Sequence, residues 1–180
     1  MQQPPAPERR PRTALLVVRG GAAIAAGIAA LLAPRSAAKA LLAGYLAADG
    51  LLGMGFAARL HVRRRARILF FVDGLVDLGV AILLFSWGPP SGVLVMIVAI
   101  WAMATGVVEI AASIFLPRLP ALAWTVALAG VASCAIGVVA LDWTDLAEIG
   151  LLYLFAAYAL IVGVLFAIVG VLLLRAVRTR

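Results

Sequence analysis

The sequence predicts an all-α, polytopic membrane protein with six transmembrane helices, arranged as three tandem helix-hairpin repeats. Three observations support this prediction. Hydrophobic residues make up 66% of the chain and charged residues only 13%, whereas soluble domains carry about 25% charged residues. Six apolar segments are each long enough to cross a hydrocarbon core of about 30 Å. A pattern of glycine and aromatic residues recurs three times in the same order.

The six apolar segments are predicted to be helices because lipid cannot satisfy the polar groups of an exposed backbone. They lack the alternation of polar and apolar residues that a membrane β-barrel requires. Short breaks that contain proline or aspartate separate the two helices of each unit, so successive helices are expected to be antiparallel. The predicted helices comprise residues 14–33, 37–58, 68–86, 92–115, 120–141 and 148–174.

The segments outside the helices define the predicted domain organisation. Residues 1–13 are polar and rich in proline and arginine, a composition that predicts a disordered cytoplasmic tail. Residues 14–175 form the predicted six-helix membrane domain, with repeats at about 14–60, 68–116 and 120–174. Residues 176–180 form a short basic tail that is also expected in the cytoplasm.

Basic residues are distributed unevenly between the two ends of the predicted helices. One end carries twelve arginines, whereas the other end carries only Arg35 and Lys39. Because cationic segments stay in the cytoplasm, both termini are expected on the cytoplasmic side of the membrane. The net charge of +7 therefore reflects topology, and no nucleic-acid partner is expected. The expected partner is the lipid bilayer, with a homo-oligomer or an unidentified membrane partner as open alternatives.

Glycines recur at equivalent positions of the three predicted units. The first helix of each unit has a glycine near its start and a small residue seven positions later, as in Gly20 and Gly27. The second helix has an aromatic residue five positions before a glycine, as in Tyr45 and Gly50. Small residues let membrane helices approach closely, and a hinge or a substrate path is the alternative interpretation. The predicted packing positions are Gly20, Gly27, Gly50, Gly74, Gly106, Gly130, Gly137 and Gly163.

The order and period of these motifs resemble the HdeD family of small bacterial membrane proteins. The resemblance covers about residues 14–175 and is clearest in the stretches VVRGGAAIAAGIAALLAP, LLAGYLAADGLLG and IVAIWAMATGVVEIAAS. It implies a role in acid-stress resistance. The third unit departs from the pattern, because it has Ala129 where the first two units have Arg19 and Asp73. If that charged position matters, the function is not threefold symmetric.

Five ionisable residues fall within the predicted helices, all in the half near the cytoplasm: Arg19, Asp49, Asp73, Asp77 and Glu109. A charged side chain at the bilayer centre costs about 2.5–3.5 kcal/mol, so these residues need partners, water or protons. We expect them to meet in one polar cluster, in which Arg19 pairs with Asp49 or Asp73. Carboxyl groups without a counter-charge favour the neutral form in a low dielectric, so the cluster is a candidate proton-responsive site.

Other interpretations of these residues remain open. The acids could act as structural glue that bonds neighbouring helices, or they could line a path for an ion or a substrate. Arg19 could instead extend to the lipid headgroups. No acid lies in the outer halves of the first five predicted helices, which argues against a continuous proton relay across the bilayer.

Motifs of enzymes and cofactor-binding proteins are absent from the sequence. It contains no H-E-x-x-H, G-x-S-x-G, Walker or dinucleotide-binding motif, and its single cysteine, Cys134, has no nearby histidine. No catalytic residue, metal or cofactor is therefore expected. The sequence predicts a non-enzymatic membrane protein with the acid-stress role that the resemblance implies. The alternative is a small proton-linked transporter or channel that uses the carboxyl cluster.

Overall fold

The computed structural model describes residues 6–59, 63–117, 120–142 and 148–178. These residues form six long α-helices and a short 3₁₀ helix, η1 (Arg35–Ala37). The prediction of an all-α chain with six long apolar helices is thereby confirmed. The α-helices, in chain order, are α1 (Ala6–Leu32), α2 (Ala38–Arg59), α3 (Arg64–Ser86), α4 (Ser91–Ile114), α5 (Pro120–Asp142) and α6 (Glu148–Arg178).

Each of the six helices contains an apolar stretch long enough to cross a membrane. The stretches range from 19 residues in α1 (Ala14–Leu32) to 26 residues in α6 (Gly150–Arg175), and about 20 apolar residues suffice for an ordinary bilayer. Large hydrophobic side chains also lie on the outside of the bundle, where Leu32, Ile114 and Trp124 are each at least 70% exposed. Lipid is the solvent that such a surface requires, so the chain is a multi-pass integral membrane protein.

Prolines set several of the helix boundaries. α3 ends at Ser86, and α4 begins after Pro90, whose carbonyl oxygen accepts a hydrogen bond from the amide of Leu94 at 2.9 Å. Proline lacks the amide hydrogen that a helix interior requires, but the first turn of a helix does not use that donor. α5 accordingly begins at Pro120. The chain therefore reverses direction within a few residues, and successive helices become antiparallel neighbours.

Three helices extend beyond their predicted limits by four residues or more. α1 begins at Ala6 rather than at residue 14, α3 begins at Arg64 rather than at residue 68, and α6 continues to Arg178 rather than ending at residue 174. Residues 6–13, which were expected to be disordered, are therefore helical, and residues 1–5 lie outside the described part of the chain. Adding residues to an existing helix is far easier than starting a new one. Pro7 lies in the first turn of α1, where a proline is tolerated.

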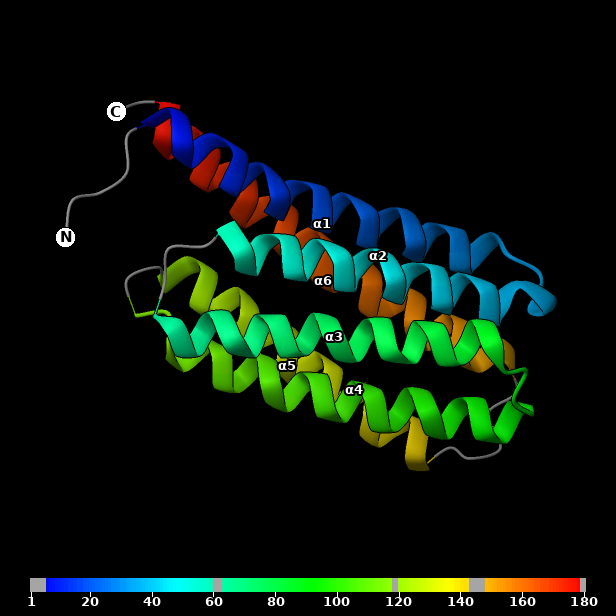
Figure 1. The fold of residues 1–180 in the computed structure, drawn as a ribbon. Coiled ribbons are helices and arrows are strands. Elements are labelled where there is room, and N and C mark those ends of the chain that lie inside the picture. Colours follow the sequence, from blue (N-terminus) through cyan, green and yellow to red (C-terminus); the bar gives the residue numbers. More distant parts are fainter. Residues whose placement is uncertain (1–5, 60–62, 118–119, 143–147, 179–180) are drawn as a thin grey trace.

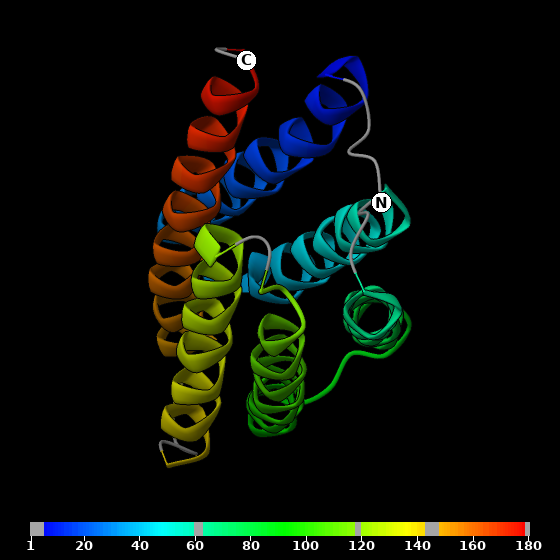
Figure 2. The same cartoon turned by 90° about the vertical axis from the view of Figure 1, so that its left-hand side faces the viewer.

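The six helices form a closed bundle in which chain neighbours are also neighbours in space. Each helix contacts the next one along the chain, and α6 returns to pack against α1. The two views of the bundle show how the first and last helices close this ring (Figure 1, Figure 2). The start of α1 and the end of α6 lie at one end of the bundle, together with the end of α2 and the start of α3 (Figure 1). This end is called the terminal end below.

The closest packing occurs in three helix pairs, α1 with α6, α2 with α3, and α4 with α5. In the second pair, Gly50 and Gly74 face each other. A Cβ atom placed on either glycine would lie 2.6 Å from the carbonyl oxygen of the other. Real Cβ atoms essentially never approach an atom so closely, so only glycine allows these two backbones to touch.

The other two pairs have the same reciprocal contact. Gly106 faces Gly130 between α4 and α5, and Gly20 faces Gly163 between α1 and α6, where added Cβ atoms would lie 2.6–2.9 Å from the opposing carbonyl oxygens. All three contacts join the second helix of one predicted unit to the first helix of another, so the tightest packing lies between the predicted units. The division into three repeats itself stays a prediction.

The two remaining predicted packing glycines also lie in helix contacts. A Cβ atom on Gly27 would lie 2.8 Å from the side chain of Leu160, and one on Gly137 would lie 2.8 Å from the carbonyl oxygen of Ala99. By contrast, Gly44 and Gly79 have open space at the Cβ position. Glycine is therefore required at the predicted positions for close packing, and it is dispensable for packing at these two other sites.

Alanine, leucine and valine side chains fill most of the bundle interior. Polar and charged side chains interrupt this core at several positions in the described helices. The buried polar and charged residues are Arg19, Asp49, Asp73, Asp77, Thr105, Glu109, Thr125 and Ser133.

Candidate functional site

The five ionisable residues predicted within the membrane all lie in the interior of the bundle. None of them is more than 8% exposed. α1 supplies Arg19, α2 supplies Asp49, α3 supplies Asp73 and Asp77, and α4 supplies Glu109. Four helices therefore direct charged side chains away from lipid and into the protein.

The paired glycines position these charged residues along the helices. Arg19, Asp49 and Asp73 each directly precede a paired glycine. Backbone contact at those glycines leaves little freedom for one helix to slide or rotate against the other. Asp49 and Asp73 consequently lie beside the same Gly50–Gly74 contact, and their depth is fixed by helix packing rather than by a loop.

Arg19 and Asp49 form a two-point ion pair between α1 and α2. The Nε atom of Arg19 donates to Oδ1 of Asp49 at 2.8 Å, and its Nη2 atom donates to Oδ2 at 2.7 Å. Two parallel charge-assisted hydrogen bonds are the strongest arrangement available to an arginine and a carboxylate. The pair fixes the plane of the guanidinium group and compensates one carboxyl group. The Arg19 side chain is therefore directed into the bundle and not toward the lipid headgroups.

Arg19 also faces two further carboxyl groups at longer distances. Its Nη2 atom lies 4.0 Å from Oδ2 of Asp73 and 3.9 Å from Oε1 of Glu109. These distances allow charge attraction but exceed the range of about 2.7–3.2 Å for an N–H···O hydrogen bond. The second oxygens, Oδ1 of Asp73 and Oε2 of Glu109, are buried and have no hydrogen-bond partner among the described residues. Two incompletely bonded carboxyl groups thus converge on a guanidinium group that is already bonded to a third.

Helix α6 contributes an aromatic ring to this cluster. The central carbon of the Arg19 guanidinium group lies 5.0 Å from the ring centroid of Phe166, within the range of a cation–π interaction. Phe166 is buried, three residues after Gly163 of the α1–α6 contact. Two other helices therefore contact the Arg19 guanidinium group, α2 through Asp49 and α6 through the ring of Phe166.

Asp77 has a different partner from the other acids. Its Oδ1 atom accepts a hydrogen bond at 2.7 Å from the indole Nε1 of Trp101 in α4. Within the described part of the chain, the ion pairs of Arg19 are with Asp49, Asp73 and Glu109, and none reaches Asp77. The structure thus brings four of the five expected residues together. Asp77 lies one helical turn away, just beyond the middle of α3 and farther from the terminal end than expected.

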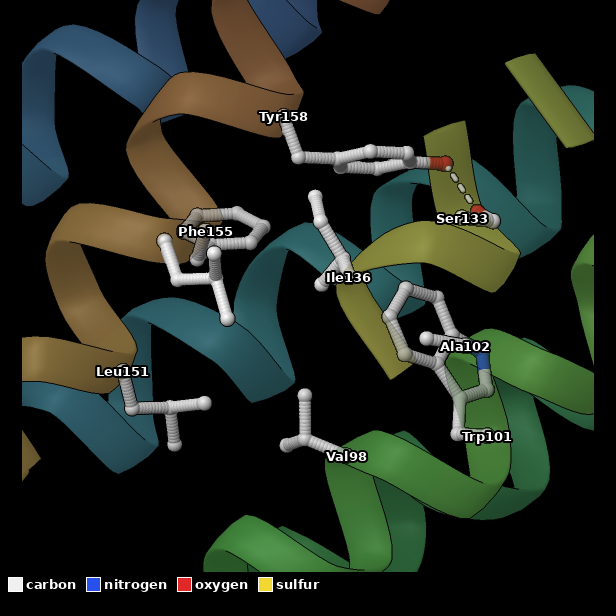
Figure 3. A pocket seen from close by; sticks show the side chains of 9 residues that line it. Val98, Trp101, Ala102, Ser133, Ile136, Leu151, Phe155 and Tyr158 are labelled. Atoms are coloured by element: carbon white, nitrogen blue, oxygen red, sulfur yellow. Dashed lines mark hydrogen bonds between the residues drawn. The ribbon is translucent and has the colours of Figure 1, made fainter. Parts of the chain in front are cut away.

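A small apolar cavity adjoins Trp101 on the side of α5 and α6. Val98 and Phe155 contribute to its apolar lining, and Ser133 and Tyr158 border it (Figure 3). The hydroxyl of Ser133 donates to the hydroxyl of Tyr158 at 2.9 Å, as the dashed line in Figure 3 marks. The polar groups on the cavity wall are therefore already bonded within the protein, and no charged side chain lines the cavity.

Negative groups outnumber positive groups in this part of the interior. One guanidinium group faces three carboxyl groups, and Asp77 adds a fourth one helical turn away. Removing an ion from water costs several kcal/mol unless a partner compensates its charge. The described residues contain no group of three His, Cys, Asp or Glu side chains placed to hold a metal ion. Carboxyl groups in excess of the positive charge around them can be neutralised by protons.

Three side chains that complete the site were not identified as site residues from the sequence: Trp101, Ser133 and Phe166. Their spacing from the paired glycines is a signal for all three, and Trp101 lies five residues before Gly106, as in the repeated motif. Phe166 occupies in α6 the position that Glu109 occupies in α4, three residues after a paired glycine. Ser133 likewise occupies in α5 the position of Asp77 in α3. The position three residues after a paired glycine therefore carries an acid in α3 and α4, a serine in α5 and a phenylalanine in α6.

Two stretches of the chain match one protein-family model. The matched residues are 18–86 and 88–142, and the model is described as a short repeat of unknown function, DUF308. Together the two stretches cover more than half of the chain and include all five ionisable residues of the bundle interior. No curated protein and no solved structure matches the chain.

Proposed function

Since the chain belongs to the DUF308 family of short repeats, we propose that it is a non-enzymatic, stress-protective protein that helps a bacterial cell to survive acid. We place it in the cytoplasmic membrane with both termini in the cytoplasm. The excess of arginines at one end of the helices supports this orientation. The resemblance of its glycine motifs to those of the HdeD family supports the acid-stress role.

The observation that carries the proposal is the excess of carboxyl groups around Arg19. Asp49 is compensated by two hydrogen bonds, but Asp73 and Glu109 each keep a buried oxygen without a partner. A buried carboxylate without full compensation destabilises the folded state, whereas a neutral carboxyl group costs much less. Acid supplies the protons that make these groups neutral.

This arrangement differs from the usual response of proteins to acid. In most proteins, carboxylates that are paired in the folded state lose their partners on protonation, and stability falls. Here, protonation of Asp73 and Glu109 removes charge that is buried and incompletely compensated, so it stabilises the folded state. In our proposal, the bundle therefore remains folded, and functions, at a pH that unfolds proteins stabilised by ionised carboxylates.

Deletion of the gene tests the proposed function. We expect the deletion strain to survive an acid challenge less well than its parent, and the wild-type gene on a plasmid to restore survival. A plasmid with Asp142→Asn, which changes an exposed acid at the end of α5, is the matched control and should restore survival equally. Equal survival of the deletion strain and its parent at every acid pH would contradict the proposal.

A second candidate function is a small proton-linked transporter or channel. The unpartnered oxygens of Asp73 and Glu109 favour this alternative, because a transport cycle needs a group that binds and releases a proton. The cavity beside Trp101 argues against it, because none of the described residues that line this cavity carries a charge.

Proton flux into liposomes that contain the pure protein distinguishes the two functions. Under the acid-protection proposal, we expect no flux above that of empty liposomes at any pH. Flux that depends on pH and is lost in Asp73→Asn would instead establish the transporter. Asp142→Asn is again the control, because it should not alter the flux in either case.

A further inference from the structure

Asp73 and Glu109 are set apart from the other acids of the interior by their incomplete bonding. Asp49 uses both carboxyl oxygens to bind Arg19, and Asp77 accepts a hydrogen bond from Trp101. Asp73 and Glu109 each place one oxygen near Arg19 and leave the other buried without a partner. Both residues are more than nine-tenths buried, so bulk water does not bond these oxygens.

The two carboxyl groups also lie close to a common atom. They come from the adjacent helices α3 and α4, and each has an oxygen within 4.0 Å of the Nη2 atom of Arg19. Two ionised carboxylates placed around the same guanidinium group repel each other, and one bound proton lowers this repulsion. A protonated carboxyl group gains an O–H donor, and the ionised partner remains an acceptor.

We propose that Asp73 and Glu109 together bind one exchangeable proton and form the proton-binding element of the acid-stress function proposed above, on which this inference rests. The proton adds to a carboxylate oxygen and forms one O–H bond there. The charge of the four-residue group of Arg19, Asp49, Asp73 and Glu109 thereby changes from minus two to minus one. The two hydrogen bonds to Asp49 hold the Arg19 guanidinium group in place beside the proton site.

Titratable and charged groups face the proton site from several helices. Arg19 and Asp49 lie on α1 and α2, and Asp77 lies on α3, bonded to Trp101. Two tyrosines, Tyr45 of α2 and Tyr158 of α6, are also buried in the bundle interior. In the described part of α5, the buried polar side chains are the hydroxyls of Thr125 and Ser133, which do not titrate and which donate to the carbonyl oxygen of Ala121 and to the hydroxyl of Tyr158.

In our proposal, the proton reaches this site past Gly53, from the terminal end of the bundle. This glycine lies one helical turn beyond Asp49 on the same face of α2, in the direction of Arg59 at the end of that helix. Gly53 is buried, yet a Cβ atom placed there would have no other atom within 4 Å. The missing side chain therefore leaves free space beside the cluster, on the side where a proton enters from the cytoplasm in our proposal.

Infrared spectroscopy of the pure protein in lipid measures the bound proton directly. A protonated carboxyl group has a C=O stretching band that a carboxylate lacks. We expect wild-type protein to show this band at neutral pH, and raising the pH to remove it. The band should be lost in both Asp73→Asn and Glu109→Gln, and retained in Asp142→Asn. A band of unchanged intensity in either of the first two variants would overturn the shared site.

The wild-type protein alone tests the identity of the ligand. Replacing choline chloride with sodium chloride at constant pH and ionic strength should leave the band unchanged. Loss of the band in sodium would show that the pair binds a metal cation, and would overturn the assignment of the proton. Because this comparison uses no variant, it does not depend on the folding of altered proteins.

The route beside Gly53 is tested by the rate at which the bound proton exchanges for deuterium. We expect Gly53→Leu to fill the free space and to slow the deuterium shift of the C=O band several-fold. Gly44→Leu is the matched control, because Gly44 is on the same helix, exposed, and also has open space at the Cβ position. Equal exchange rates in the two variants would overturn the proposed route.

The spectroscopic tests and the survival test can fail independently. Loss of acid survival in the deletion strain without the C=O band would leave the acid-stress role intact and overturn the shared proton. The band without a survival defect would leave the proton site intact and overturn the acid-stress role.

Discussion

Gly50 of α2 and Gly74 of α3 touch each other so closely that each excludes a side chain on the other. An added Cβ atom on either residue would lie 2.6 Å from a carbonyl oxygen. The contact lies beside Asp49 and Asp73, the residues that directly precede the two glycines. Helix packing and the position of two acids of the cluster are therefore set by the same pair of residues.

Gly50→Ala should destabilise the bundle. The added methyl group would force α2 and α3 apart, and overpacking of this kind costs about 1–3 kcal/mol. Gly44→Ala is the control on the same helix, because its Cβ atom meets nothing within 4 Å. That control should be neutral or slightly stabilising. Thermal unfolding in detergent micelles measures both effects, and equal melting temperatures for the two variants would contradict the packing role.

Arg19→Met should destabilise the protein more than any substitution of a lipid-facing residue. Removal of one partner from a buried ion pair costs about 3–5 kcal/mol, because the other charge is left without compensation. The double variant Arg19→Met with Asp49→Asn removes both charges and should recover part of that loss. Unfolding of the two single variants and the double variant forms a mutant cycle. Strictly additive losses would show that the ion pair is not energetically coupled.

Trp101→Phe should remove the only hydrogen-bond donor that the described residues provide to Asp77. A buried acceptor left without a partner costs about 1–3 kcal/mol. Trp124→Phe is the matched control, because Trp124 is 71% exposed on the lipid-facing surface, and its effect should stay within about 0.5 kcal/mol. The comparison uses chemical unfolding in detergent. A loss in the control as large as that in Trp101→Phe would count against the bond to Asp77.

The stability of the wild-type bundle should fall as the pH rises. If the folded state holds the proton shared by Asp73 and Glu109, it binds more protons than the unfolded state near neutral pH. The slope of the unfolding free energy with pH is then negative, by up to about 1.4 kcal/mol per pH unit for each proton. Melting temperatures between pH 5 and pH 8 measure this slope. In Asp73→Asn with Glu109→Gln the slope should flatten, and an unchanged slope would assign it to other groups.

The number and type of the helices could be predicted because they depend on local properties of the sequence. Length and hydrophobicity of each segment are sufficient to predict a span, since lipid admits few alternatives to a helix. The ends of α1 and α6 could not be predicted in the same way. The extension of α1 back to Ala6 lies outside the apolar span that begins at Ala14. It depends on the cooperativity of an existing helix, which composition does not report.

The candidate site could be predicted only in part. Depth along each helix follows from residue number, so the grouping of Arg19 with Asp49, Asp73 and Glu109 was accessible from the sequence. The choice of partners depends on how the helices are rotated, and the glycine contacts set that rotation. For this reason the bond between Asp77 and Trp101, and the ring of Phe166 beside Arg19, could be seen only in the structure.

Contact between the first and last helices constrains the order in which the protein can be assembled. Synthesis runs from the N-terminus, so α1 and α2 are made first, and the ion pair of Arg19 and Asp49 lies within that first hairpin. The surface of α1 around Gly20, however, meets its partner only when Gly163 of α6 arrives. This surface of α1 therefore lacks its protein partner through most of synthesis, until the final helix is inserted and packs against it.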